Sequence, residues 1–544
     1  MATGEIHCLP PHEHKARPLA VFLLLVAPFL FGALSLYLGQ DANWDLRNYH
    51  WYNAYAFLNG RYDLDLLPSQ TPYFYNPTLD IPFYLIATHA SAQLTGFLLG
   101  WVQGLNFILL FMLAHVSLII PNPRQKVLVS AGLATLGMIG GGGIAMLGTV
   151  FYDNVTSLGI FLSALLVIRH FDRLVNAPLK KAFLLAFLFG IPSGLMMGLK
   201  LPSVIFCVGF CFALLFVGGT FQRRFMITFA FGLGVLCGVA VTLGHWAWFL
   251  QTHFGSPLFP YFNNVFHAPL APDSSARDTQ FITRSFHDFI LFPFIFTDSP
   301  YRVGEIPWRD WRLLILYVLL PTAIVVRLFF GRSKNTHDAM AVPYAARYLL
   351  WAGALSYFTW LGMFCVYRYA IPMEMLAPLL IVFAVGMLPL KLHTRGLIAA
   401  FILVIIAASI QGGNWTRRAD WSERFVETGV PELGTTSDVM VLLAGFEPYS
   451  HVIPQLPSDM RFVRIQSNFS SPDQNKGINQ MLHDRVNAHK GRLMLLIPPW
   501  QKNVGAEALG YYDLALENKP CQTVIDHLYQ HKPIDLCPVI RLKP

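Results

Sequence analysis

A stretch rich in chemically capable side chains lies between Gly39 and Gly60, with the sequence "GQDANWDLRNYHWYNAYAFLNG". It directly follows the uncharged segment 18–38. A carboxylate at the edge of a membrane is partly desolvated, which raises its pKa and suits it to take a proton from a hydroxyl. Asp45 is therefore a candidate catalytic base, and Asp41 is an alternative for that role. Asp41 is a candidate substrate-binding residue, and its alternative role is to close or cap the loop.

Three isolated cations elsewhere in the chain are candidates for binding a phosphate group. Lys200 is the only charged residue between Lys181 and Arg223, Arg368 lies in a short apolar turn, and Arg302 lies on a long loop. Such cations stabilise the negative charge that develops on a departing phosphate. The alternative for Lys200 and Arg368 is an anchoring role, in which the charged head reaches the lipid headgroups.

Asp153 lies where two apolar segments meet, and a charge in such a place is costly. It is a candidate catalytic residue that orients an acceptor or binds a divalent metal ion, and a structural pair with Lys200 is the alternative. Tyr49, His50 and Tyr52 follow the predicted base and are candidate substrate-binding residues. Alternatively, His50 is a hydrogen-bonded structural residue, and the two tyrosines anchor the chain at the membrane interface.

The composition indicates which kind of fold must position these residues. Hydrophobic residues make up 54% of the chain, charged residues 13%, and the mean hydropathy is +0.47. A soluble protein carries about 25% charged residues, and an apolar run of roughly 20 residues crosses a bilayer as a helix. We predict an all-α polytopic membrane protein whose first span is retained rather than cleaved as a signal peptide. About eleven spans are expected, at 18–39, 100–120, 127–148, 154–170, 182–198, 201–218, 227–250, 311–330, 348–366, 371–390 and 396–411.

The distribution of basic residues predicts the orientation of these spans. With a cytoplasmic N-terminus, alternate loops read "PNPRQK", "RHFDRLVNAPLKK", "FQRR", "RLFFGRSKNTHDAMAVPYAAR" and "KLHTR", and each has more basic than acidic residues. This excess is typical of cytoplasmic loops. The net charge of +8 then reflects topology and contact with anionic headgroups, and it gives no support for a nucleic-acid partner.

The chain divides into two predicted modules. Residues 1–411 form the transmembrane module, with juxtamembrane helices on the outer loop 40–99 and a second long outer loop at 251–310. Residues 412–544 are more charged and predict a small extracytoplasmic α/β domain. Its strands are expected in "DVMVLLAG" and "RLMLLIPPW", and its helix in "DQNKGINQMLHDRVNAHKG".

Cysteine and glycine patterns add two expectations. Cys521 and Cys537 are the only cysteines of the C-terminal domain, and an oxidising compartment favours a disulfide over two free thiols. The other five cysteines show no metal-ligand spacing. The glycine-rich stretch "GMIGGGGIAMLG" lies in an apolar span, which favours close helix packing over the binding of a phosphate.

Five segments together resemble a known family. "DLRNYHWYNAYAFLNGRY", with Asp45 and Tyr49 four residues apart, is similar to the first outer loop of the C-fold superfamily of integral-membrane glycosyltransferases, which includes bacterial aminoarabinose transferases and protein mannosyltransferases. Weaker matches follow in order over residues 18–375, at "YFYNPTLDIPFYLI", "FYDNV", "GLMMGLKLPS" and "YRYAIPMEMLAP". The segment "YFYNPTLDIPFYLI" has Asn76-Pro77-Thr78 where the family often has Lys-Pro-Pro.

This resemblance implies a transferase of the bacterial inner membrane. It would move a sugar from a polyprenyl-phosphate donor to a hydroxyl of a lipid, glycan or protein acceptor on the extracytoplasmic face, with Asp45 as general base. The cofactor is undetermined, and a divalent metal ion is the candidate. The alternative is a secondary transporter or a lipid or oligosaccharide flippase, although the chain shows no similarity between its halves.

Overall fold

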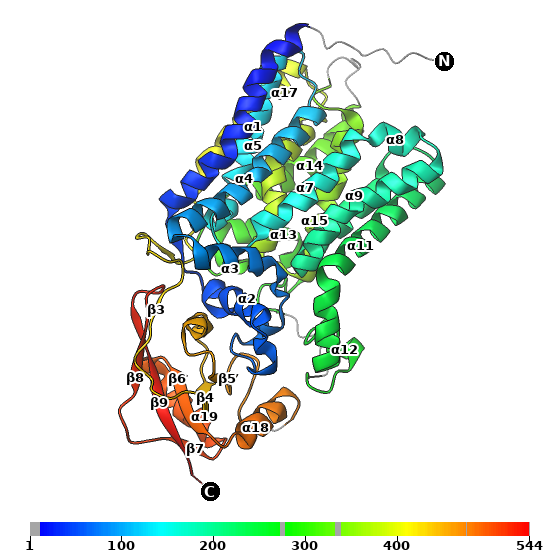
Figure 1. The fold of residues 1–544 in the computed structure, drawn as a ribbon. Coiled ribbons are helices and arrows are strands. Elements are labelled where there is room, and N and C mark those ends of the chain that lie inside the picture. The colour runs from blue at the N-terminus through cyan, green and yellow to red at the C-terminus, as the bar shows by residue number, and fades with distance from the viewer. Residues whose placement is uncertain (1–10, 273–277, 332–338, 475, 543–544) are drawn as a thin grey trace, which may run out of the picture. The chain divides into compact units, whose positions relative to one another are not determined.

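The computed structural model describes residues 11–272, 278–331, 339–474 and 476–542 (Figure 1). The chain forms two compact units. The helical unit comprises Met1–Ser35, Leu98–Thr242 and Asp278–Asn414. The sheet unit comprises Leu36–Phe97, Leu243–Arg277 and Trp415–Pro544. Residues 273–277, which belong to the predicted outer loop 251–310, lie outside the described residues.

The helical unit consists of helices that run side by side (Figure 1). The boundaries between the two units fall within three helices, α1, α4 and α11. In chain order the helices are α1 (Pro11–Leu38), α4 (Ala92–Ser117), α5 (Pro123–Met138), α6 (Gly141–Met146), α7 (Asp153–Arg169), α8 (Phe171–Asn176), α9 (Leu179–Leu199), α10 (Val204–Ala213), α11 (Phe221–Phe254), α13 (Phe286–Asp298), α14 (Arg312–Phe330), α15 (Pro343–Met363), α16 (Ile371–Gly386) and α17 (Leu392–Ser409).

Seven helices among the described residues are long and apolar enough to cross a membrane. They are Ala16–Leu38, Ala92–Ser117, Leu179–Leu199, Phe221–Phe254, Arg312–Phe330, Tyr367–Gly386 and Leu392–Ser409. The predicted membrane-protein class is therefore supported, whereas the number of eleven spans is not confirmed. The other four predicted segments also contain helices, but α5, α7 and α10 have fewer than 18 residues and α15 is less apolar.

Small residues allow the helices to approach closely, as is usual between apolar helices. A Cβ atom at Gly190 would collide with the carbonyl oxygen of Phe231, and one at Gly194 with that of Val235. Glycines of α9 therefore bring its backbone against that of α11. This packing fixes the position of Lys200, which directly follows α9.

The predicted span 127–148 is interrupted at its glycines, which corrects the prediction of a continuous helix. α5 ends at Met138 and the short helix α6 begins at Gly141. The backbone N–H groups of Gly142 and Gly143 donate to the carboxylate of Glu374, at 3.0 and 2.7 Å. A Cβ atom at Gly140 would collide with the same carboxylate. The glycine-rich stretch thus forms a turn that binds a buried carboxylate.

The sheet unit contains a seven-stranded sheet in the order β3-β8-β9-β6-β4-β5, with β7 also paired to β9. β4 is parallel to β5 and β6, and β9 is antiparallel to β6, β7 and β8. The strands are β3 (Thr428–Gly429), β4 (Val439–Leu443), β5 (Arg461–Arg464), β6 (Arg492–Ile497), β7 (Leu514–Leu516), β8 (Gln522–Asp526) and β9 (Lys532–Arg541). All five residues of β4 are buried, as expected for a central strand of a parallel segment.

The predicted elements of the C-terminal domain are present. β4 and β6 occupy the two predicted strands, and α18 (Ile478–Ala488) lies within the predicted helical stretch. A second helix, α19 (Lys502–Gly510), follows β6. A disulfide joins Cys521 and Cys537, the pairing that the sequence favoured, close to the contact between β8 and β9.

The loop 40–99, which the sequence predicted to lie outside the membrane as part of the transmembrane module, belongs to the sheet unit up to Phe97. β1 (Gln40–Asp41) pairs with β2 (Arg417–Arg418). A π-helical turn η1 (Leu46–His50) leads into α2 (Trp51–Leu58), and α3 (Asp80–His89) follows after several turns. α3 has ten residues, which is too short to cross a bilayer. The loop is therefore a folded part of a domain built largely from the C-terminal tail.

Candidate functional site

Three predicted site residues of the helical unit lie at the ends of helices. Asp153 is the first residue of α7 and follows Tyr152, which has a φ of 59°. Lys200 follows the last residue of α9. Arg368 lies in the 3-10 turn η9 (Tyr367–Ala370) that leads directly into α16. Helix packing therefore fixes the backbone at each of these charges.

These three side chains form a cluster around Phe151, which we name the cation cluster. The Nζ of Lys200 donates to Oδ2 of Asp153 at 2.7 Å and also to the carbonyl oxygen of Phe151. The guanidinium carbon of Arg368 lies 4.4 Å from the centroid of the Phe151 ring. Lys200 also lies 5.8 Å from the ring of Tyr369. The structure thus brings Asp153, Lys200 and Arg368 together.

Charges of both signs meet in the cation cluster. Burial raises the pKa of Asp153, and the nearby cations Lys200 and Arg368 act in the opposite direction. Both cations therefore lie close enough to this buried carboxylate to act on it. Glu305 lies 4.0 Å from Arg368, but its side chain is 47% exposed and its attraction is screened by water.

Arg302, the third predicted phosphate ligand, has a partner of its own. Its Nη2 donates to Oδ2 of Asp288 at 3.0 Å, and its guanidinium lies 5.7 Å from the ring of Phe292. Both partners lie on α13. Arg302 therefore joins the turn η7 (Pro300–Arg302) to α13, which is a structural role.

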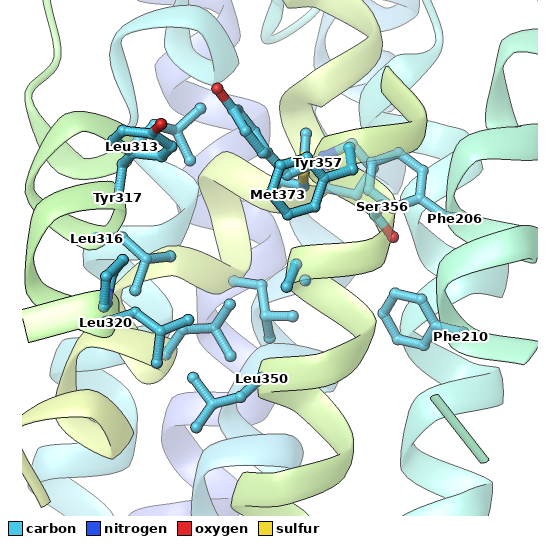
Figure 2. Close-up of a pocket in the computed structure, with 17 residues that line it drawn as sticks. Phe206, Phe210, Leu313, Leu316, Tyr317, Leu320, Leu350, Ser356, Tyr357 and Met373 are labelled. Atoms are coloured by element: carbon cyan, nitrogen blue, oxygen red, sulfur yellow. The ribbon is translucent and has the colours of Figure 1, made fainter. Parts of the chain in front are cut away.

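An apolar cavity lies between α10, α14, α15 and α16 in the helical unit (Figure 2). It holds about 820 Å³ of space between side chains, including the part that is open to its surroundings. Figure 2 shows the side chains of Phe206, Phe210, Leu316, Leu350 and Met373 around it. The few polar groups in its wall are those of Ser356, Tyr317 and Tyr357. A hydrocarbon chain suits such a lining.

The cavity and the cation cluster are linked through the chain. α10, which carries Phe206 and Phe210, begins four residues after Lys200. α16, which carries Met373, begins three residues after Arg368. The two turns that hold the cations therefore also start two helices of the cavity wall.

The sheet unit holds the predicted base in a second cluster, which we name the loop cluster. Asp45 immediately precedes η1, and its Oδ2 accepts a hydrogen bond from the hydroxyl of Tyr49 at 3.3 Å. The ring of Tyr49 lies 4.0 Å from that of His50. The Nδ1 of His50 lies 2.6 Å from Oδ1 of Asp80. π-helical turns are rare and occur often at functional sites, where they re-aim side chains.

Asp80 is a member of the loop cluster that the sequence analysis missed. It is the first residue of α3 and lies within the quoted motif "YFYNPTLDIPFYLI". A carboxylate this close to Nδ1 places the ring proton there, which fixes the tautomer and orientation of His50. The sequence signal that could have identified Asp80 is its position as an acidic residue in the first turn of an apolar helix.

Asp41 and Tyr52 have structural contacts in the sheet unit. Asp41 accepts hydrogen bonds from the backbone and side-chain nitrogens of Asn43, at 3.0 and 2.9 Å, which closes the loop before η1. The hydroxyl of Tyr52 donates to Asp65 at 2.8 Å, and Arg61 donates to both oxygens of that carboxylate. Burial raises the pKa of Asp65, while its hydrogen bonds from Arg61 and Tyr52 lower it. Tyr52 is fully buried, so it supports the loop from within.

A second buried network, to which the sequence analysis assigned no role, lies next to the turn of Arg368. Glu374 accepts from the hydroxyl of Tyr367 at 2.7 Å in addition to the two glycine N–H groups. Arg312 donates to Asp310 at 2.9 Å and to the backbone oxygen of Glu374 at 3.1 Å. Glu374 and Arg312 are fully buried. The network fixes α6, α14 and α16 together and so supports η9.

Among the residues that the structure describes, Cys521, Asp535 and Cys537 form a compact group of potential metal ligands, whose ligand atoms lie within 4.8 Å of one another. The disulfide occupies both thiols. This group therefore does not serve as a metal site while the bridge is formed.

No family model matches the chain, and the search of curated proteins found no match in sequence. The site is therefore interpreted from its own geometry.

Proposed function

We propose that the protein is a membrane glycosyltransferase that uses a polyprenyl-phosphate sugar as donor. The proposal takes up the family resemblance of the sequence. Asp45 is the general base, Lys200 and Arg368 bind the donor phosphate, and Asp153 holds Lys200 in position. The acceptor is a hydroxyl of a lipid, a glycan or a protein.

The observation that carries the proposal is the link between the cation cluster and the apolar cavity. A polyprenyl phosphate joins a strong anion to a long hydrocarbon chain. Lys200 and Arg368 offer charge-assisted hydrogen bonds to the anion, and the helices that begin beside them line a space for the chain. An amphiphilic ligand of this kind needs both features near each other.

The proposed reaction is a displacement at the anomeric carbon of the sugar. Asp45 accepts the proton of the acceptor hydroxyl as its oxygen bonds to the anomeric carbon. The bond between that carbon and the phosphate oxygen breaks, and its electron pair remains on the phosphate. Lys200 and Arg368 stabilise the charge that develops there, a contribution of about 10² to 10³ in rate for one well-placed donor.

We place the reaction on the extracytoplasmic face of a bacterial inner membrane, with a cytoplasmic N-terminus. The support is the excess of basic residues in alternate loops of the sequence. The resident disulfide of the sheet unit is compatible with an oxidising compartment.

Mass spectrometry of cell-envelope glycans tests the proposal. Cells that lack the protein should lose one sugar modification, and cells with Asp45→Asn should show the same loss at normal protein levels. Asp63→Asn is the matched control, because Asp63 is an exposed carboxylate of the same unit. Full modification with Asp45→Asn would remove the mechanism.

An assay in detergent micelles separates this enzyme from a transporter or flippase. Micelles have no two compartments, so transport produces no new compound there. A glycosylated product formed in micelles by the wild type, and not by Asp45→Asn, requires catalysis.

A further inference from the structure

The sheet unit has a strand order that creates a crevice at one edge of its sheet. The chain passes from β4 to β5 on one side and then to β6 on the other side of β4, so the parallel segment has the order β5-β4-β6. In open parallel sheets the loops at the carboxyl ends of two such strands diverge, and ligands bind between them. Here the two strands are β4 and β6.

The loops that follow these strands approach each other at a glycine. Gly445 follows β4 and has a φ of 86°, and a Cβ atom there would collide with Oε1 of Gln501, which follows β6. Each loop also exposes an aromatic ring. The side chain of Phe446 is 46% exposed and that of Trp500 is 53% exposed. Large rings at such exposure, one in each loop of a crevice, suggest a binding surface.

A lysine and a tyrosine extend this surface. The Nζ of Lys532, at the start of β9, lies 5.3 Å from the ring of Trp500 and 4.4 Å from that of Tyr529. β9 is antiparallel to β6, with Asp535 opposite Ile497, so its first residues lie at the same edge as the end of β6. Lys532 is half-buried and holds the edge of the aromatic surface in place.

Acceptor groups at the same edge have no hydrogen-bond partner within the described residues. The Oε1 atoms of Gln466, just after β5, and of Gln501, just after β6, are buried and unsatisfied. β4 lies between the two strands that these glutamines follow, so one unpaired acceptor stands on each side of β4. Buried polar atoms are normally paired, and these two acceptors therefore point to an external donor. Hydroxyl groups supply such donors.

We propose that the carboxyl edge of β4 and β6 binds a saccharide chain. The faces of Trp500 and Phe446 carry partial negative charge and attract the C–H face of a pyranose ring. Sugar hydroxyls donate to Gln501 and Gln466, and Lys532 accommodates a hydroxyl or an acidic substituent. The inference does not depend on the proposed transfer reaction, since none of these residues belongs to the cation cluster or the loop cluster.

Saturation-transfer NMR on the full-length protein in lipid nanodiscs tests the proposal with three probes: maltohexaose, chitohexaose and hexagalacturonate. At least one should give a signal, and Trp500→Ala should weaken its binding about tenfold, or about 1.4 kcal/mol. Trp500→Phe should retain most of the affinity because it keeps a ring. Tyr511→Ala is the matched control, since Tyr511 is 49% exposed but follows the far end of α19.

The outcomes are distinct. A signal that survives Trp500→Ala, or the absence of a signal for all three probes, would overturn the saccharide site. Asp45→Asn should bind the saccharide as the wild type does, so failure of the transferase proposal and failure of this one are separately visible.

Discussion

Removing the charge of Lys200 tests whether the cation cluster is catalytic or only structural. Lys200→Met keeps the length of the side chain and deletes its hydrogen bonds to Asp153 and to Phe151. Lys200→Met combined with Asp153→Asn deletes both charges of the pair. The two variants differ in whether a buried carboxylate remains without its partner.

The structure sets the expected magnitudes. The side chains of Lys200 and Asp153 are 17% and 5% exposed. Deleting one partner of a buried pair costs about 3–5 kcal/mol, and the partial access of water to Lys200 reduces this to about 2–3 kcal/mol for Lys200→Met. The double variant should recover most of the loss and stay within about 1 kcal/mol of the wild type. Transfer should fall at least 100-fold in both variants.

The pH dependence of stability provides a further check on the single variant. The pKa of Asp153 is already raised by burial, and loss of Lys200 raises it more. A carboxyl group with a raised pKa in the folded state contributes stability while protonated and loses it as pH rises through that pKa. The destabilisation by Lys200→Met should therefore grow with increasing pH and shrink in acid.

Thermal unfolding followed by tryptophan fluorescence gives the stability, and product formed per folded protein gives the activity. A stable and fully active double variant would refute the reasoning, because the pair would then be structural only. Equal stability of the single and double variants would refute the coupling between the two charges.

Three other variants probe the remaining parts of the structure. Glu374→Gln should lower the free energy of unfolding by about 2–4 kcal/mol, because Arg312 loses a nearby negative charge in a buried network. The control is Glu305→Gln at an exposed position, which should change the free energy of unfolding by less than about 0.5 kcal/mol in the same thermal unfolding assay. Ala354→Phe places a ring in the cavity wall and should raise the KM for the lipid-linked donor about tenfold with little change in kcat, whereas Ala354→Ser should not; an unchanged KM would separate the cavity from donor binding. Burial raises the pKa of Asp526, but the combined effect of His451, Arg47 and the hydrogen bonds of Asp526 is stronger and lowers that pKa. The ionised Asp526 therefore stabilises the fold, and this stabilisation is lost as pH falls through the folded-state pKa. Asp526→Asn should flatten the acid side of a plot of unfolding free energy against pH.

The sequence was sufficient to predict those helices and strands whose formation depends on neighbouring residues. Apolar runs predicted a helix at each of the eleven segments, and buried β-branched and leucine-rich runs predicted β4 and β6. The break between α5 and α6 was missed because it depends on Glu374, more than 200 residues away along the chain. An apolar glycine run without that carboxylate would favour continuous helix packing.

The candidate site was predictable to the extent that its residues are isolated charges. Lys200 and Asp153 were identified because a lone charge between apolar segments is costly, and the structure pairs them. Asp80 was missed because its place in the first turn of an apolar helix marks an unusual acid but does not reveal its contact with His50, 30 residues away along the chain. Tyr52 resembled its neighbours in type, and only its contact with Asp65 distinguishes a buried support from a surface residue.

The fold also gives the C-terminal tail a role that its sequence did not suggest. Gln40 pairs with Arg418, Leu66 with Val463, and the backbone N–H of Phe462 donates to Asp65 at 2.9 Å. The loop that carries Asp45 is therefore held by strands formed some 400 residues later, through Asp65 and its partners. A long loop without regular structure would lose the orientation of a catalytic carboxylate, since a displacement of about 1 Å can cost 100-fold in rate. We infer that the sheet unit preorganises the proposed base, and that the proposed saccharide site at the end of β4 and β6 was built onto this support.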